Sequence, residues 1–149
     1  MFLSGMLARG RTVVKVSAIT SARRAARWLA VAMWMGGIFY LSQQTAPLGA
    51  TASESESIVA HLSLYAGLAL LIQWALTGGA VRRSLVFGWA PIAFALTVLY
   101  GVSDEAHQAF VPGRTPSLAD IALDVAGSML GVGLALLTAA LLNMRSLRH

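Results

Sequence analysis

Long apolar segments alternate with short polar ones, and four of the apolar segments approach the roughly 20 residues that a helix needs to cross the hydrocarbon core of a bilayer. They are residues 28–41, 58–76, 85–102 and 118–143. The first is short unless Ala25, Ala26 and the polar SQQTA stretch extend it, with Arg27 reaching its charge to the interface. The pattern predicts an all-α fold, an integral membrane four-helix bundle.

The polar SESES stretch before the second segment predicts a hydrated loop that ends in a helix cap. Ser57 would cap the helix, and Glu54 and Glu56 would lie near its positive N-terminal end. In the third segment, Pro91 predicts a kink, because proline lacks the N–H that an unbroken helix uses at that position. Both features are interpreted as structural.

Composition narrows the class of protein. Of the 149 residues, 57% are hydrophobic and 11% are charged, which is far fewer charges than soluble domains carry. The chain has no cysteine, so disulfides and thiolate metal sites are excluded. The net charge of +5 does not indicate nucleic-acid binding, because the bases flank apolar segments and form no basic face interleaved with aromatic side chains.

The charged residues predict how the chain is oriented in the membrane. Most bases fall on one side of the four spans: Arg9, Arg11, Lys15, Arg23, Arg24, Arg27, Arg82, Arg83, Arg145 and Arg148. Since Lys and Arg accumulate in cytoplasmic loops, both termini are predicted to lie in the cytoplasm. The acids belong to the external side: Glu54, Glu56, Asp104, Glu105, Asp120 and Asp124. Arg114 is the one base among them.

The arginine-rich start of the chain, followed by an apolar run, also resembles a secretory signal. Cleavage would remove the first span and place the termini on opposite sides, so a retained anchor is favoured. Residues 12–27 are predicted to form a short basic helix on the inner leaflet, with a disordered tail as the open alternative. The expected organisation is a basic cytoplasmic segment, 1–24, a four-helix transmembrane domain, 25–143, and a cytoplasmic tail, 144–149.

Three of the predicted helices carry polar stripes at a similar depth. Helical spacing places these residues on one face of the second, third and fourth spans: His61 and Tyr65; Tyr100, Asp104, His107 and Gln108; Asp120, Asp124, Gly127 and Gly131. Polar groups inside a membrane helix normally face the bundle or a wet cavity. The three stripes are therefore expected to meet near the external side.

The last stripe combines acids with a small-xxx-small pattern, Gly127 to Gly131, that lets a neighbouring helix approach closely. Asp124 lies well inside the span, where an unpaired carboxylate is costly, so a partner is required. Arg114, or a protonated His61 or His107, could supply it. For Arg114, the chain must turn at Pro112–Gly113 and start the last helix at Pro116–Ser117.

This polar cluster allows a structural and two functional interpretations. It could be a hydrogen-bonded network that only holds the helices in register. It could bind a divalent cation or act as a base through His61, His107 and nearby acids, with Arg114 holding an anionic head group such as a lipid phosphate. It could also be a non-catalytic pocket for an envelope lipid, a peptide terminus or a partner protein. DEAHQ is not the zinc motif HExxH, and the metal and cofactor stay unknown.

Candidate roles follow from these interpretations. Glu105, His61 and His107 are the candidate acid/base residues. Candidate binding residues are Arg114, Tyr65, Asp104, Gln108, Asp120 and Asp124. Transport is disfavoured, because four spans show no inverted repeat and no charged residue lies deep in the inner half. A homo-oligomer would supply more helices and is left open.

Three stretches together resemble the VanZ-like membrane proteins over residues 28–135: HLSLYAGLAL, the run SDEAHQAFVPGRTPSLADIALDVAGSMLG, and FYLSQQ. The resemblance carries the family pattern onto His61, Tyr65, Asp104, Glu105, Gln108, Arg114, Asp120, Gly127 and Gly131. Relatives often have a lysine shortly before the first histidine, which SESESIVAH lacks, and many have asparagine in place of Asp124. These departures leave Arg114 less assisted as an anion-binding residue.

The resemblance implies a small multi-pass protein of the bacterial cytoplasmic membrane, in a family similar to a protein associated with teicoplanin resistance. The expected function is recognition or modification of an envelope component, an envelope lipid or a cell-wall precursor, through an outward-facing polar pocket. The contrasting expectation is a structural or regulatory membrane protein whose polar cluster only stabilises the bundle.

Overall fold

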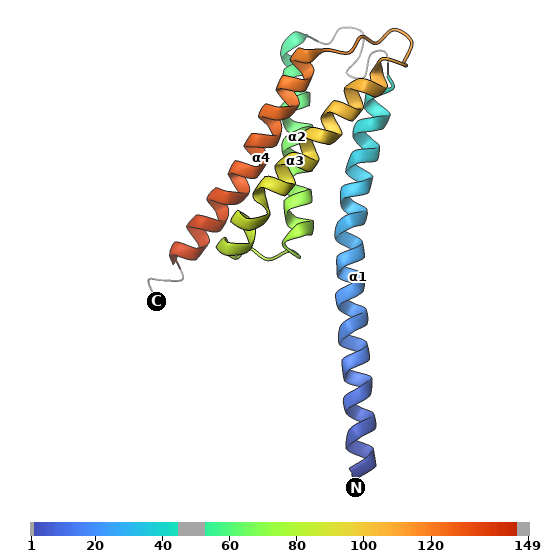
Figure 1. Cartoon of the computed structure of the whole chain (residues 1–149), viewed down its shortest axis with the longest axis vertical. Coiled ribbons are helices and arrows are strands. Elements are labelled where there is room, and N and C mark those ends of the chain that lie inside the picture. Colours follow the sequence, from blue (N-terminus) through green and yellow to red (C-terminus); the bar gives the residue numbers. More distant parts are fainter. Residues whose placement is uncertain (1, 45–52, 146–149) are drawn as a thin grey trace.

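The computed structural model describes the backbone of residues 2–44 and 53–145, and side chains within these ranges from residue 19 to residue 144. The chain forms the helices α1 (Phe2–Ser42), α2 (Glu54–Leu76), α3 (Arg83–Gln108) and α4 (Leu118–Arg145), and the described ranges contain no strand (Figure 1). The predicted all-α helical fold is confirmed. The middle of the predicted external loop, 45–52, and residues 146–149 of the predicted tail lie outside the described residues.

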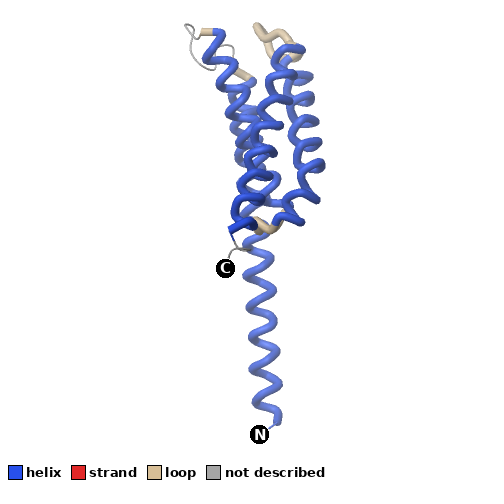
Figure 2. Tube along the Cα trace, turned by 90° about the vertical axis from the view of Figure 1, so that its left-hand side faces the viewer, coloured by secondary structure: helices blue, strands red, loops and turns tan. Residues whose placement is uncertain are grey.

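Helices α2, α3 and α4 pack against one another, whereas α1 packs on α2 and, more weakly, on α3. Within the described residues α1 makes no contact with α4. The N-terminal half of α1 continues in a straight line beyond the other three helices (Figures 1 and 2). The predicted short basic helix at residues 12–27 is therefore wrong, because these residues belong to one unbroken helix with the apolar part of α1.

The distribution of side chains is that of a membrane protein. Helices α2, α3 and α4 are long and apolar enough to cross a bilayer. Large apolar residues such as Met33, Leu99 and Met129 are exposed, whereas Glu105, Gln108 and other polar residues are buried. In a bilayer this arrangement places apolar surface against lipid and polar groups against one another. The described part of α1 does not meet the same criterion, so a fourth span at residues 28–41 stays a prediction.

The N-cap of helix α2 lies four residues before the predicted cap. Ser53 is the N-cap: its side chain accepts from the backbone N–H of Glu56, and the Glu56 carboxylate accepts from the backbone N–H of Ser53 at 2.7 Å. This reciprocal capping box satisfies two N–H groups that the helix leaves free at its start. The predicted cap at Ser57 is wrong, and Ser57 lies inside the helix.

Two glycines set the distance between α2 and α4. A Cβ on Gly127 would lie 2.7 Å from the Leu62 carbonyl oxygen, and one on Gly131 would collide with the Ala66 carbonyl oxygen. The small-xxx-small pattern therefore has the predicted effect: the backbones of α2 and α4 touch where side chains are absent. Helix α3 contains Pro91 without interruption, and its C-terminal turns reach Gln108.

The charges lie at opposite ends of the bundle. The start of α2, the end of α3 and the start of α4 meet at one end, which holds all the acids and Arg114 (Figure 1). Arg82 and Arg83 lie at the other end, where Arg27 lies over the Trp74 ring at 5.9 Å. The predicted separation of acids and bases is present for the described side chains.

Candidate functional site

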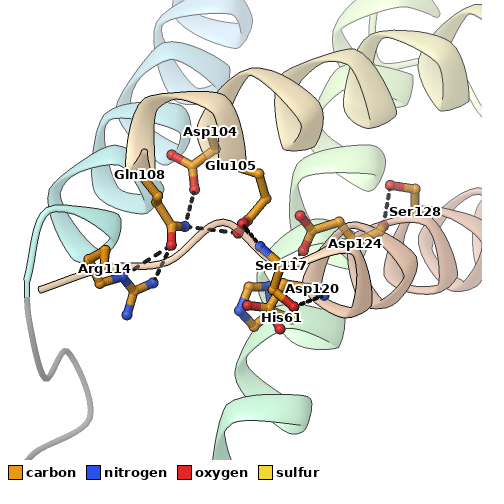
Figure 3. A network of polar contacts seen from close by, with 9 residues as sticks. All are labelled: His61, Asp104, Glu105, Gln108, Arg114, Ser117, Asp120, Asp124 and Ser128. Atoms are coloured by element: carbon orange, nitrogen blue, oxygen red, sulfur yellow. Dashed lines mark hydrogen bonds and ion pairs between the residues drawn. The ribbon is translucent and has the colours of Figure 1, made fainter. Parts of the chain in front are cut away.

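The polar stripes meet at the acidic end of the bundle, in a network contributed by α2, α3, α4 and the segment between α3 and α4 (Figure 3). His61 and Tyr65 come from α2, Asp104, Glu105 and Gln108 from the last turns of α3, and Asp120 and Asp124 from α4. Spacings of three or four residues keep each set on one side of its helix. The predicted meeting of three helices is therefore found.

His61 and Asp124 form the link between α2 and α4. His61 Nδ1 lies 2.8 Å from Asp124 Oδ1, and the two side chains are 17% and 2% exposed. Of the three partners predicted for Asp124, the structure selects His61. Close packing holds the carboxylate in place, since a Cβ on Gly101 of α3 would lie 3.0 Å from Asp124 Oδ2.

Glu105 joins the end of α3 to the start of α4. Its Oε1 accepts from the Gln108 amide at 3.0 Å, and its Oε2 accepts from the backbone N–H of Ser117 at 2.9 Å. The Ser117 hydroxyl in turn accepts from the backbone N–H of Asp120 at 3.2 Å, which caps α4. Both oxygens of this buried carboxylate are therefore used in holding the two helices together.

Arg114 binds an amide, not a carboxylate. Its Nε and Nη2 donate to Gln108 Oε1 at 3.1 and 2.7 Å. The turn at Pro112–Gly113 makes this contact: the Arg114 N–H donates to the Val111 carbonyl at 3.1 Å, and Gly113 has a φ of 80°. Arg114, one of the three candidate partners of Asp124, instead contacts Gln108, because the turn returns its side chain over the last turn of α3.

Gln108 connects the arginine to the acids. Its amide nitrogen donates to Glu105 Oε1 at 3.0 Å and to Asp104 Oδ2 at 3.4 Å, while its oxygen accepts from Arg114. One buried glutamine thus contacts a cation on one side and two acids on the other. Arg114 keeps Nη1 free of hydrogen bonds to any described residue.

The predicted α3 stripe divides into two sides. Asp104 and Gln108, one turn apart, join the network, whereas the His107 ring packs at a tilt against Phe39 of α1 with ring centroids 4.6 Å apart. The Tyr100 hydroxyl donates to the Met35 carbonyl of α1 at 2.6 Å. His107 lies one residue before Gln108 on α3, and its ring contacts Phe39 of α1. The joint role of His61 and His107 therefore stays a prediction.

A small cavity of about 80 Å³ opens beside the network. Its polar lining includes His61, Tyr65, Asp104, Gln108 and Arg114, and its walls include Ile38 and Leu41 of α1. Asp104 Oδ1 and the Tyr65 hydroxyl are buried and have no hydrogen-bond partner among the described residues. A volume of this size holds several waters or one polar group of a ligand.

Two serines also line the cavity, and sequence reasoning did not select them. Ser42, at the end of α1, and Ser57, which was assigned to a helix cap, both contribute to the wall. Ser42 follows the apolar part of α1 within a polar run, so its position in the sequence offered a weak signal. Asp120 lies near His61 at the start of α4, as Figure 3 shows, but does not line the cavity.

The described residues contain no group of three or more His, Asp or Glu side chains that could hold a metal ion. His107 packs against the Phe39 ring of α1. The described side chains offer hydrogen bonds and charge for recognition of a ligand.

A family model described as VanZ/LLP1 matches residues 27–140. The chain belongs to the VanZ/LLP1 family. The match includes the cavity and every helix from the apolar part of α1 to most of α4, so the resemblance predicted from sequence is confirmed. No curated protein and no solved structure matches the chain. The VanZ/LLP1 assignment therefore identifies the family, while the activity has to be argued from the site.

Proposed function

We propose that this VanZ/LLP1 protein recognises an anionic component of the cell envelope through the cavity at the acidic end of the bundle. The observation that carries the proposal is the lining of the cavity: an arginine without a carboxylate partner stands beside Asp104 Oδ1 and the Tyr65 hydroxyl, which lie near Ser42 and Asp124 without a hydrogen bond of good geometry. A network that served only to join helices would be expected to satisfy its own atoms.

Arg114 is the residue that would hold the anion. It is half-buried, Gln108 orients its guanidinium by two hydrogen bonds, and among the described side chains the only ion pair is His61–Asp124. An oriented guanidinium whose charge is not neutralised by a carboxylate favours a phosphate or carboxylate ligand. The ligand would add charge-assisted hydrogen bonds to the free Nη1.

The deeper part of the cavity favours a donor on the same ligand. Asp104 Oδ1 can only accept when the carboxyl group is ionised, and the Tyr65 hydroxyl can donate or accept. A hydroxyl or ammonium group next to the anionic group of the ligand would satisfy both. The proposed ligand therefore carries an anionic group and a hydrogen-bond donor within the same head group.

We propose in addition that the protein chemically modifies the bound ligand, with His61 as the candidate base. Its Nδ1 is held by Asp124, so the imidazole is oriented and its other nitrogen is left for the cavity that it lines. Glu105 is less suited to acid/base chemistry, because both of its oxygens are engaged with Gln108 and Ser117. For Glu105 the observations favour the alternative function, stabilisation of the bundle.

We further propose that the protein lies in the bacterial cytoplasmic membrane with its basic end and both termini in the cytoplasm. The positive-inside rule supports this orientation, since Arg27, Arg82 and Arg83 share one end. The cavity would then open toward the outer surface, where glycopeptides such as teicoplanin act. A change in teicoplanin sensitivity on deletion or overexpression is the expected link to resistance, and alkaline phosphatase and fluorescent-protein fusions at the C-terminus test the orientation.

The decisive experiment compares Arg114→Ala with Arg83→Ala. Arg83 is a matched control, because it lies at the opposite end and its guanidinium is 5.3 Å from the Phe87 ring, away from the cavity. Native mass spectrometry of the purified proteins measures anionic compounds that co-purify from the membrane. We expect them on the wild type and on Arg83→Ala and a loss of about tenfold or more on Arg114→Ala, with unchanged helical content. Equal retention by Arg114→Ala would refute the proposal.

A further inference from the structure

An apolar groove runs between α1 and α2 on the side of the molecule away from α4. It has a volume of about 720 Å³ and is lined by Ala30, Met33, Trp34, Gly37, Ile38, Leu41, Leu64, Gly67, Leu70 and Leu71. The lining contains no charged residue. Grooves of this volume accommodate a ligand of considerable size.

The groove adjoins the polar cavity. Ile38, Leu41 and Leu64 line both, so the apolar groove ends where the polar lining begins. A single molecule could place a polar group beside Arg114 and extend an apolar chain past these three residues. The two parts together have the chemical character of an amphiphile.

Missing side chains keep the groove open. A Cβ added at Gly37 meets nothing within 4 Å, although Gly37 lies on the wall of the groove. The wall opposite is fixed: the Trp34 ring occupies the space above Gly67, where a Cβ would lie 2.6 Å from it, and the Trp34 indole N–H donates to the Leu64 carbonyl at 2.9 Å. Gly67 therefore leaves the space that the Trp34 ring occupies, whereas Gly37 leaves space in the groove unfilled.

We propose that the groove binds the hydrocarbon chain of an anionic membrane lipid whose head group occupies the polar cavity. This inference rests on the proposed function and names its ligand as a lipid. Arg114 favours an anionic group on the ligand, and the Asp104 carboxylate, which lines the same cavity, requires a hydrogen-bond donor beside that group in the same head group. The groove opens on exposed apolar surface, where Met33 is 70% exposed. If α1 crosses the membrane as predicted, a chain enters the groove from the bilayer without crossing water.

Gly37→Leu and Gly36→Leu form a matched pair for the test. Both positions lie on α1 with open space around a Cβ, but only Gly37 lines the groove. The probes are dioleoyl phosphatidylglycerol and glycerol 3-phosphate, added to delipidated protein in detergent, with bound molecules counted by native mass spectrometry. Arg114→Ala is measured in parallel.

We expect the lipid to bind the wild type and Gly36→Leu equally, and Gly37→Leu about tenfold more weakly. Glycerol 3-phosphate, which has no chain, is expected to bind far more weakly than the lipid. Wild-type lipid binding by Gly37→Leu, equal binding of the two probes, or no lipid on the wild type would each overturn the inference. If Gly37→Leu binds like the wild type while Arg114→Ala does not, the groove is refuted and the anion site stands.

A second substitution guards against misfolding of Gly37→Leu. Ala30 lines the same groove about two helical turns before Gly37, and Ala30→Leu narrows it there. Loss of the lipid in Ala30→Leu with retention in Gly36→Leu supports the inference. If Ala30→Leu keeps a folded bundle and still retains the lipid as strongly as the wild type, the chain does not follow the groove and the inference fails.

Discussion

Helix α2 presents two contrasting faces to its neighbours. On the side of α4, Leu62 and Ala66 touch Gly127 and Gly131 so closely that no side chain fits between the backbones. On the side of α1, Leu64 and Leu71 border an open groove. The closed face fixes the His61–Asp124 pair, whereas the open face leaves space that a ligand can fill. Glycines line both contacts of α2. Gly127 and Gly131 of α4 allow close backbone contact, whereas Gly37 of α1 leaves open space.

The closed face should depend most strongly on its ion pair. In His61→Leu, the Asp124 carboxyl loses its partner while 2% exposed, and we expect the free energy of unfolding to fall by about 3–5 kcal/mol. In the double variant His61→Leu with Asp124→Leu, no buried charge remains and most of this loss should be recovered. Denaturation by SDS, followed by circular dichroism, measures both. A double variant as unstable as the single would contradict the assignment of the pair.

Backbone contact on the closed face should give the next largest effect. Gly131→Leu places a side chain against the Ala66 carbonyl and should lower the free energy of unfolding by about 2–3 kcal/mol, as overpacking does. Gly133→Leu on the same helix is the control, since a Cβ there meets nothing within 4 Å. Similar stability of the two variants in the same SDS titration would show that α2 and α4 are less closely packed than described.

The smallest effect is expected on the open face. Trp34→Phe removes the hydrogen bond to the Leu64 carbonyl but keeps an aromatic ring over Gly67, so the loss should be about 0.5–1 kcal/mol. Trp28→Phe is the control, because Trp28 is 38% exposed and makes no hydrogen bond to a described residue. A loss as large as that of Gly131→Leu would remove the contrast between the two faces.

Local signals predicted most of the helices and the positions of their polar stripes. The start of α4 at Leu118, the turn at Pro112–Gly113 and the close approach at Gly127 and Gly131 all follow from residue types at short spacing. The cap of α2 was placed four residues too late, because SESES offers several serines and only Ser53 has Glu56 at the spacing of a capping box.

The partners within the candidate site were less predictable. His61 was one of three candidates for Asp124, and Arg114 was assigned to acids, although it binds the amide oxygen of Gln108. Spacing along a helix places residues on a common side, but the rotation of each helix about its axis determines which side chain from another helix they meet. The partner of His107 was unpredictable for the same reason, since its ring packs against Phe39 of α1.

The amino-acid sequence by itself determined the helical membrane class, the separation of acids from bases and the three polar stripes. These properties depend on residue type and on spacing along one helix, which tertiary contacts do not alter. The tertiary structure alone decided that Gln108 orients Arg114, that α1 stands away from α4, and that Gly37 borders an open groove. Each of these depends on the distance between helices, a quantity set by packing across residues far apart in the chain.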